Sequence, residues 1–250
     1  MIHQQPIETV TGQNGGRYYL VDPLEGKSYP SVTTVLGNMT DKSGIDNWVK
    51  RVGEKKAAEI SKYSANRGSF MHLMNENYLD RRFTQGIKEN LVRYSLETTL
   101  KDPDVKDFHR SEYTSGKDLF MNFYGARTFD TIEDVVIQEV ALWSPRGGGY
   151  AGRVDLVARM VDKTLKIIDF KSSTRVKPEK WIDSYKMQIA AYSVAYFDLY
   201  GDLPDGGEIW ISNEQYEYPQ IFKMNRNDIK HWFVKFQELV KGYHKKFHNA

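Results

Sequence analysis

Asp169 and Lys171 interrupt the apolar run "KIIDFKSS", which otherwise has the pattern of a β-strand covered on both faces. Successive side chains of a strand point to opposite faces, so residues two apart share a face and this acid and base project together. Burying a charged group costs free energy unless another group pairs with it. An aspartate and a lysine held side by side in an apolar strand therefore indicate a functional site that needs charged groups.

Two further strand patterns each carry one acid. Glu139 lies in the middle of "EDVVIQEVALWS", and Asp155 lies in "YAGRVDLVARMV", three residues after Gly152. With Asp169, one carboxylate falls on each of three consecutive strands, where like charges would repel one another strongly. A divalent cation relieves that repulsion, and carboxylate and water oxygens suit Mg²⁺ and Mn²⁺. The pattern predicts a hydrolytic metal site, in which Lys171 orients the attacking water or offsets charge on a phosphate.

Each motif has a plainer interpretation on its own. Asp169 and Lys171 alone would more often be ordinary solvated residues at a strand end, and Asp155 alone is no more specific. The ordered set of acids on consecutive strands is what favours the metal site, because scattered surface charges do not explain it.

The three strand patterns are predicted to form an antiparallel meander. Turn residues join the first two patterns, and Asp162 and Lys163 join the last two. A helix is predicted around "WIDSYKMQIAAYSVAYFDLYG", ending near Gly201, followed by a strand pair, "EIWISN" and "YPQIFKM". The closing helix begins near Asn225 and has one apolar stripe, formed by Ile229, Trp232, Phe233, Phe236, Leu239, Val240 and Tyr243.

The N-terminal half has a different character. Residues 1–30 contain short strand patterns separated by turns, and the pattern then becomes mostly helical. Ser31 is predicted to cap one helix, and Ser64 another that runs to about Leu79. Apolar residues at helical spacing in "IDNWVKRV", and the segment "KDLFMNFYGARTF", indicate two more helices.

Composition limits the kind of protein that this chain can form. Its 250 residues suffice for a single integrated α/β domain, with strands and a helical elaboration in residues 1–130 and the core in residues 131–250. The 35 Lys and Arg nearly balance 33 Asp and Glu, so a nucleic-acid-binding surface must be local. The absence of cysteine excludes disulfides, thiolate zinc sites and iron–sulfur clusters. With neither a signal-peptide pattern nor an apolar run long enough for a membrane span, we expect a soluble, cytoplasmic protein.

The ordered motifs resemble those of the PD-(D/E)XK nuclease superfamily, specifically its RecB-type exonuclease branch, which includes the mitochondrial genome maintenance exonuclease and phage exonucleases. That branch begins with a helical motif of Gly then His, matched by Gly68 to His72. A strand glutamate, a G-x-x-D motif and a D-x-K motif follow, matched by Glu139, Gly152–Asp155 and Asp169–Lys171. The final Q-x-x-x-Y motif is matched by Gln188 to Tyr192.

The resemblance implies a restriction-endonuclease-like fold, with a mixed central β-sheet flanked by helices and an N-terminal helical elaboration that carries the His motif. It implies Mg²⁺ or Mn²⁺, bound by His72, Asp155, Asp169 and the backbone carbonyl of Phe170, with Glu139 bound directly or through water. Catalytic roles are implied for Glu139, Asp155, Asp169, Lys171, Gln188 and Tyr192. Many relatives carry a four-cysteine iron–sulfur cluster, and this chain resembles the members that have none.

Several residues near the motifs are candidates for holding DNA. The stretch "SVTTVL" resembles an N-terminal segment of some of these exonucleases, and hydroxyls at a helix start can bind phosphate. Ser31 more simply caps the helix, which leaves Thr33 and Thr34 as the candidates there. Arginines that flank the motifs could hold the DNA backbone: Arg67, Arg153 and Arg175.

We expect a metal-dependent DNA exonuclease that hydrolyses phosphodiester bonds from a DNA end, acting on single-stranded DNA or tails in replication, recombination or repair. The helical stretch that carries His72 must fold back over the meander, which would make a tunnel or arch that admits a strand by its end. One alternative is a structure-specific or restriction-like endonuclease. Another is a non-catalytic DNA-binding module, against which the intact Asp155, Asp169 and Lys171 argue. The resemblance also suggests a bacterial or phage origin and a single-strand-binding or recombination protein as partner.

Overall fold

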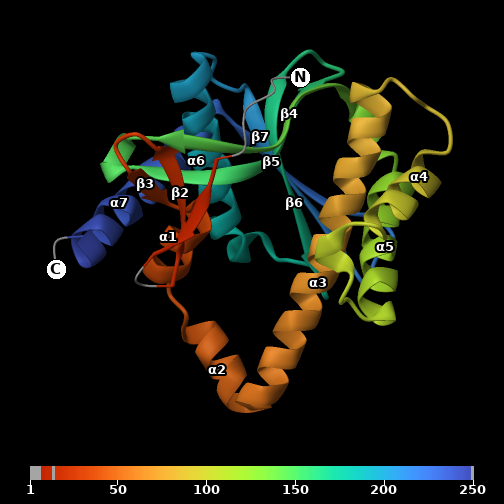
Figure 1. The fold of residues 1–250 in the computed structure, drawn as a ribbon, viewed down its shortest axis with the longest axis horizontal. Coiled ribbons are helices and arrows are strands. Elements are labelled where there is room, and N and C mark those ends of the chain that lie inside the picture. The colour runs from red at the N-terminus through yellow and green to blue at the C-terminus, as the bar shows by residue number, and fades with distance from the viewer. Residues whose placement is uncertain (1–6, 13–14, 249–250) are drawn as a thin grey trace.

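The computed structural model describes residues 7–12 and 15–248, and its centre is a five-stranded mixed sheet (Figure 1). The strands lie in the order β4-β5-β6-β7-β8, with the bounds Ile132–Ser144, Tyr150–Met160, Leu165–Ser173, Gly206–Asn213 and Gln220–Asn225. β6 and β7 are parallel, and the other neighbours are antiparallel. The predicted meander and the mixed sheet are both confirmed.

Helices cover both faces of this sheet. Their bounds are α1 (Val32–Met39), α2 (Ser43–Val52), α3 (Glu54–Leu79), α4 (Leu91–Thr99), α5 (Arg110–Gly125), α6 (Asp183–Tyr200) and α7 (Arg226–His248). Apolar side chains of α1, α6 and α7 pack in one cluster with Ile167, and those of α3, α4 and α5 pack in another with Ile168. Since these adjacent residues enter opposite clusters, β6 is buried on both faces, as its apolar run predicts.

Shorter helical segments join the main elements. They are the π-helical η1 (Asp80–Thr84) and the 3₁₀ turns η2 (Pro103–Val105), η3 (Thr128–Thr131), η4 (Arg146–Gly148) and η5 (Glu179–Trp181). No helix within the described residues is long and apolar enough to cross a membrane.

A small antiparallel sheet of three strands precedes the helices and lies against the main sheet. Its strands are β1 (Thr9–Thr11), β2 (Arg17–Asp22) and β3 (Lys27–Pro30), which confirms the short strands expected there, although residues 1–6 and 13–14 lie outside the described part of the chain. The Tyr18 hydroxyl lies 2.8 Å from the Tyr243 hydroxyl on α7, and Ser31 bridges to Ala151 on β5. The small sheet is thereby fixed beside the strand that carries Asp155.

The two predicted helix caps have different outcomes. Ser31 accepts a hydrogen bond of 2.9 Å from the Thr34 backbone N–H, so its role as the cap of α1 is confirmed. The prediction for Ser64 is wrong, because α3 begins at Glu54 and Ser64 lies inside a helix of 26 residues. Gly53, with φ at +85°, allows the chain to turn out of α2, and the "EKKAAE" that follows consists of strong helix formers.

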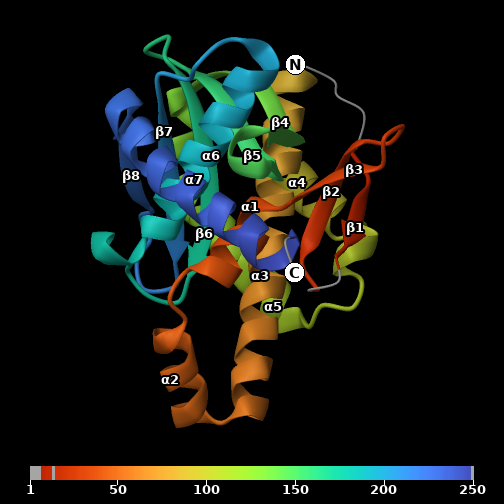
Figure 2. The ribbon, with the colours of Figure 1, turned by 90° about the vertical axis from the view of Figure 1, so that its left-hand side faces the viewer.

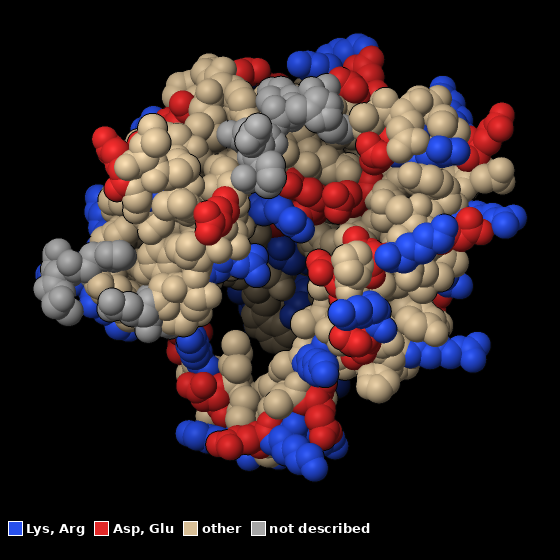
Figure 3. Space-filling view, in the orientation of Figure 1, with Lys and Arg blue, Asp and Glu red and all other residues tan. Residues whose placement is uncertain are grey.

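α2 and the first half of α3 project from the body of the molecule as a pair of helices (Figures 1 and 2). α2 has no fully buried residue, and its Ile45 is 62% exposed. The molecular surface is hollowed beside this projection, and Lys and Arg side chains lie along the walls of the hollow (Figure 3).

Candidate active site

The centre of the site is a pair of acids that face each other on β4 and β5. Gln138 pairs with Leu156 and Val140 with Val154, so Glu139 lies opposite Asp155 across the ladder. Like charges in directly opposed positions destabilise a sheet. Glu139 also has a φ of +52°, a left-handed conformation that is strained for a residue with a side chain. Strain and repulsion at the same position indicate a functional constraint.

The ladder between β5 and β6 ends where the third acid lies. Its register runs from Arg159 opposite Leu165 to Leu156 opposite Ile168, and does not extend to Asp155 and Asp169. Instead, the Asp155 side chain accepts a hydrogen bond of 2.8 Å from the Phe170 backbone N–H. The site therefore lies where the sheet opens between these strands and frees backbone and side-chain groups for ligands.

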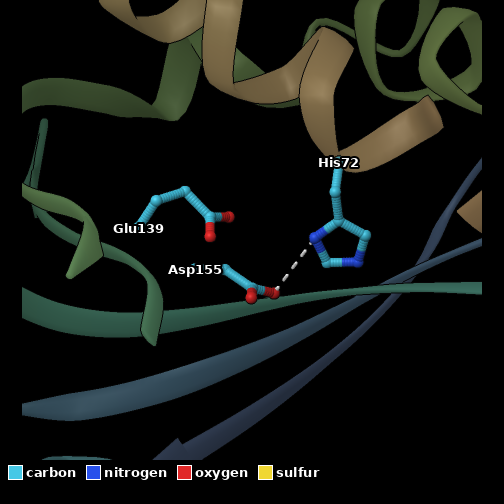
Figure 4. Close-up of side chains that lie close together, drawn as sticks. All are labelled: His72, Glu139 and Asp155. Atoms are coloured by element: carbon cyan, nitrogen blue, oxygen red, sulfur yellow. Dashed lines mark ion pairs between the residues drawn. The ribbon is translucent and has the colours of Figure 1, made fainter. Parts of the chain in front are cut away.

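His72 on α3 reaches the paired acids from the other side. Its Nδ1 lies 3.6 Å from an Asp155 carboxylate oxygen (Figure 4), and its ring packs edge-on against the Phe170 ring. Ligand atoms of His72, Glu139 and Asp155 all lie within 4.8 Å of one another. The long helix α3 is thus the element that completes a group able to hold a metal ion.

The electrostatics of the site favour an added positive charge. Burial, and then the facing Asp155, raise the pKa of Glu139 well above its usual value. Burial likewise raises the pKa of Asp155, and raises that of Asp169 to about 6. Burial and the nearby Lys171 lower the pKa of His72 to about 4, so its ring is neutral and free to ligate near pH 7. Two carboxylates and a neutral imidazole form a donor set that suits a divalent cation.

Asp169 and Lys171 form a buried ion pair beside this group. The Lys171 Nζ lies 2.6 Å from the Asp169 carboxylate, and only 1% of the Asp169 side chain is exposed. Burial alone would lower the pKa of Lys171, but Asp169 and Asp155 together raise it above the usual value, so the ammonium stays charged. Lys171 also lies 5.2 Å from the centre of the Tyr185 ring on α6. Asp169 is thus held by the lysine and lies beside the three residues, His72, Glu139 and Asp155, that could hold a metal ion.

Gln188 and Tyr192 lie on one face of α6 and line the cavity that contains the acids. The Gln188 Nε2 and the Tyr192 hydroxyl are 3.4 Å apart. The Tyr192 ring lies so close to Gly152 that a Cβ added there would be 2.8 Å from it. The glycine of the Gly152–Asp155 motif therefore provides the space in which this tyrosine packs.

The site opens into a cavity of about 680 Å³. His72, Glu139, Asp155 and Lys171 line it, together with residues from the small sheet and from α3. Arg17 and Tyr19 of β2 belong to this wall, and sequence reasoning missed them, because the strand pattern of residues 1–30 carries no signal of where that sheet packs. A second pocket, of about 730 Å³, lies between α5 and the end of β7 and contains none of these groups.

The residues proposed to hold DNA lie in different environments. Thr33 lines the cavity, whereas the Thr34 hydroxyl is engaged by the Arg17 backbone and by Ser31. Arg153 is 60% exposed on the cavity wall, with its Nε 2.7 Å from Glu139.

Arg67 and Arg175 do not line the cavity. The Arg67 side chain is 2% exposed and forms an ion pair with Glu214, so the assignment of Arg67 to the DNA surface is corrected. Position 67 faces inward because α3 is packed against α5 there, which a motif-based reading of "NRGSFMH" does not reveal. Arg175 is exposed, two residues beyond the end of β6.

Comparison with models of protein families identifies the superfamily of this chain. The sequence model of the PD-(D/E)XK nuclease superfamily matches residues 47–249. A comparison with curated proteins gives no match. The crystal structure of a "Putative exonuclease" from Eubacterium rectale is 13% identical over 60% of this chain, with a TM-score of 0.43, and the match spans 63% of that protein. The crystal structure of SSO0001 is 16% identical over 67% of this chain and 84% of that chain, with a TM-score of 0.33.

Proposed function

The chain belongs to the PD-(D/E)XK nuclease superfamily, and from this premise we propose that it is a metal-dependent DNA exonuclease of the RecB-type branch. The observation that carries the proposal is the group formed by His72, Glu139 and Asp155, which lies beside the Asp169–Lys171 ion pair. The order of the motifs along the chain, from the helical His72 to Tyr192, supports the assignment to that branch.

The donor set fits Mg²⁺ or Mn²⁺, the divalent metals that nucleases of this superfamily use. The buried carboxylates of Glu139 and Asp155 face each other, and a cation bound between them would relieve their repulsion. His72, Glu139 and Asp155 would hold the ion, with the Phe170 carbonyl and Asp169 beside them. A bound ion supplies a nucleophilic water at neutral pH and stabilises the charge on the scissile phosphate.

The chain's own residues have separate tasks in this reaction. The charged Lys171 would orient the attacking water and offset the negative charge that grows on the phosphate. Asp169 fixes the lysine in place through their 2.6 Å contact. Gln188 and Tyr192 would hold the phosphate on the α6 side of the cavity, and Arg153 would hold a neighbouring phosphate on the β5 side.

A requirement for a DNA end is supported by the way α3 crosses the site. The helix brings His72 onto the acids, and with α2 it extends past the body beside the surface hollow (Figures 1 and 3). A strand that must pass beneath a helical cover enters by its end, and a single strand does so most easily because it is flexible. We therefore propose single-stranded DNA, or a single-stranded tail, as the substrate.

Closed and linear single strands of the same sequence test this function. With Mg²⁺ we expect the linear strand to be degraded, the closed circle to survive, and bulky groups on the ends to stop digestion. Both strands in EDTA serve as the control. Rapid degradation of an intact circle would remove the exonuclease proposal and favour an endonuclease.

A further inference from the structure

Three aromatic side chains stand exposed on two loops at one end of the sheet. Trp181 in η5 is 64% exposed, and Tyr216 and Tyr218, in the turn between β7 and β8, are 61% and 70% exposed. Large apolar side chains gathered on a surface mark an interaction site, because water solvates them poorly. We call Trp181, Tyr216 and Tyr218 the aromatic patch.

Hydrogen bonds join the segment after β6 to the segment after β7, and since β6 and β7 are parallel, both loops leave the same end of the sheet. The Lys177 N–H donates to Gln220 Oε1 at 2.7 Å, and Gln220 Nε2 donates back to the Lys177 carbonyl at 3.0 Å. The Tyr216 carbonyl accepts from Asn122 Nδ2 at 3.0 Å, and Asn213 Oδ1 accepts from the Tyr216 N–H at 3.1 Å. The backbone that carries the rings is held in place, although the rings themselves are in solvent.

Basic residues accompany the aromatic patch. Arg175, Lys177 and Lys180 precede Trp181, and the acid in the same segment, Glu179, lies 2.8 Å from Lys186. On the other loop, Glu214 is paired with Arg67, and Glu217 lies between the two tyrosines. The segment between β6 and α6 is therefore the positively charged side of the patch, and a polyanion fits there.

The same segment leads directly out of the candidate active site. Arg175 follows Lys171 by four residues, a span of at most about 14 Å in an extended chain. Tyr185, whose ring contacts Lys171, follows Trp181 by four residues. Figure 2 shows β1–β3 on one side of the molecule and the segments at the ends of β6 and β7 on the other. A strand that enters past Arg17 and Tyr19 and crosses the acids would emerge at the patch.

We propose that Trp181, Tyr216 and Tyr218 form a stacking platform for the unpaired bases of a single strand on the far side of the cleavage site. The proposal rests on the function proposed above, in that the strand is the substrate of the neighbouring site. Each ring stacks on a base of any sequence, since every base has a flat π-face, and the three cations hold the phosphates between them. The aromatic patch thereby binds the strand independently of its base sequence.

A binding measurement in EDTA tests the platform without relying on cleavage. Fluorescence anisotropy would follow a labelled oligothymidine and an abasic oligonucleotide of the same length, with the intact protein and with the double variant Trp181→Ala/Tyr218→Ala. We expect the double variant to bind oligothymidine at least fivefold more weakly, as loss of one stacked base implies, and to bind the abasic strand unchanged. Leu24→Ala is the matched control, since Leu24 is 98% exposed on the β2–β3 turn and its loss should alter neither affinity.

Conservative variants separate stacking from plain apolar contact. Trp181→Phe/Tyr218→Phe should retain most of the affinity for oligothymidine, and Trp181→Leu/Tyr218→Leu should lose it. Unchanged oligothymidine binding in the alanine variant, an equal loss for both oligonucleotides, or full rescue by leucine would overturn the proposal, and rescue by leucine would point to a protein-binding surface. Because no metal is present, absence of cleavage in Mg²⁺ would count against the proposed function and not against the platform.

Discussion

Glu139 is constrained by both its backbone and its neighbours. It combines a left-handed backbone, a position opposite Asp155 and an ion pair with Arg153. A residue held against its conformational preference beside a like charge lowers the stability of the folded protein, unless something compensates for it. At the scale of single residues, the site is built to receive positive charge, and its acids should destabilise the metal-free protein.

The variant Glu139→Gln tests how far this carboxylate lowers the stability of the metal-free protein. The folded protein raises the pKa of Glu139 above its ordinary value of 4.5, so the folded state binds this proton more tightly than the unfolded chain does. The destabilisation caused by the Glu139 carboxylate is therefore absent at pH values below the ordinary pKa and complete at pH values above the raised pKa. We expect the metal-free variant to be more stable than the parent by about 1 kcal/mol at pH 8, with a smaller gain at pH 5. Thermal unfolding at both pH values measures this, and a gain that does not change with pH would contradict it.

Lys171→Ala separates the lysine from the metal group. Without the ammonium, turnover of bound DNA should fall by about 100-fold or more, because a group that acts on the water or the phosphate is lost. His72, Glu139 and Asp155 remain, so calorimetry at pH 8 should still detect Mn²⁺ binding.

Lys166→Ala provides the control for that experiment. Lys166 lies on the same strand and pairs with the buried Glu208 at 2.6 Å, so its loss should reduce stability while turnover by the folded protein is retained. If Lys171→Ala loses metal binding together with activity, Lys171 has only a structural role.

At the scale of elements, the sequence patterns predict the sheet better than the helices. Strands β4, β5 and β6 can be predicted because alternating and continuous apolar runs report directly on burial. The start of α3 could not be predicted from Ser64, since a serine signals a cap only where the preceding turn cannot continue the helix. Arg67 is buried because α3 packs against α5. These helices are far apart in the sequence, so the residues around Arg67 do not predict this packing.

The contact between β5 and α6 gives a prediction at this scale. A Cβ at Gly152 would lie 2.8 Å from the Tyr192 ring, which is buried among the core residues of α6 and has little room to move aside. Gly152→Ala should therefore lower the free energy of unfolding by about 1–3 kcal/mol and reduce cleavage, because Asp155 and Tyr192 are displaced together. Denaturant unfolding and turnover measure the two effects.

Gly37→Ala is the control for Gly152→Ala. Gly37 lies in α1, and a Cβ there meets nothing within 4 Å, so alanine should leave activity unchanged and raise stability by about 0.5–1 kcal/mol. Equal behaviour of the two variants would show that the contact with Tyr192 is not what requires a glycine at position 152.

At the scale of the whole molecule, the site draws on three parts that are distant in the sequence. The main sheet provides the acids and Lys171, α3 provides His72, and the small N-terminal sheet completes the cavity wall with Arg17 and Tyr19. With a net charge of only +2, the molecule attracts DNA through local groups and not through its overall field. Residues near the motifs could be found from the sequence, but the contribution of β2 depends on the docking of separate sheets.

Cleavage of linear single-stranded DNA by the intact protein and by Asp155→Asn tests the central claim most directly. Asparagine can still accept the hydrogen bond from the Phe170 N–H, so the fold should persist and DNA binding should remain, while one charged oxygen ligand is lost. We expect the intact protein to degrade the strand with Mg²⁺ or Mn²⁺ and not in EDTA, and Asp155→Asn to be slower by about 1,000-fold or more. Full activity of Asp155→Asn in Mg²⁺, or undiminished cleavage in EDTA, would contradict the assignment of this site.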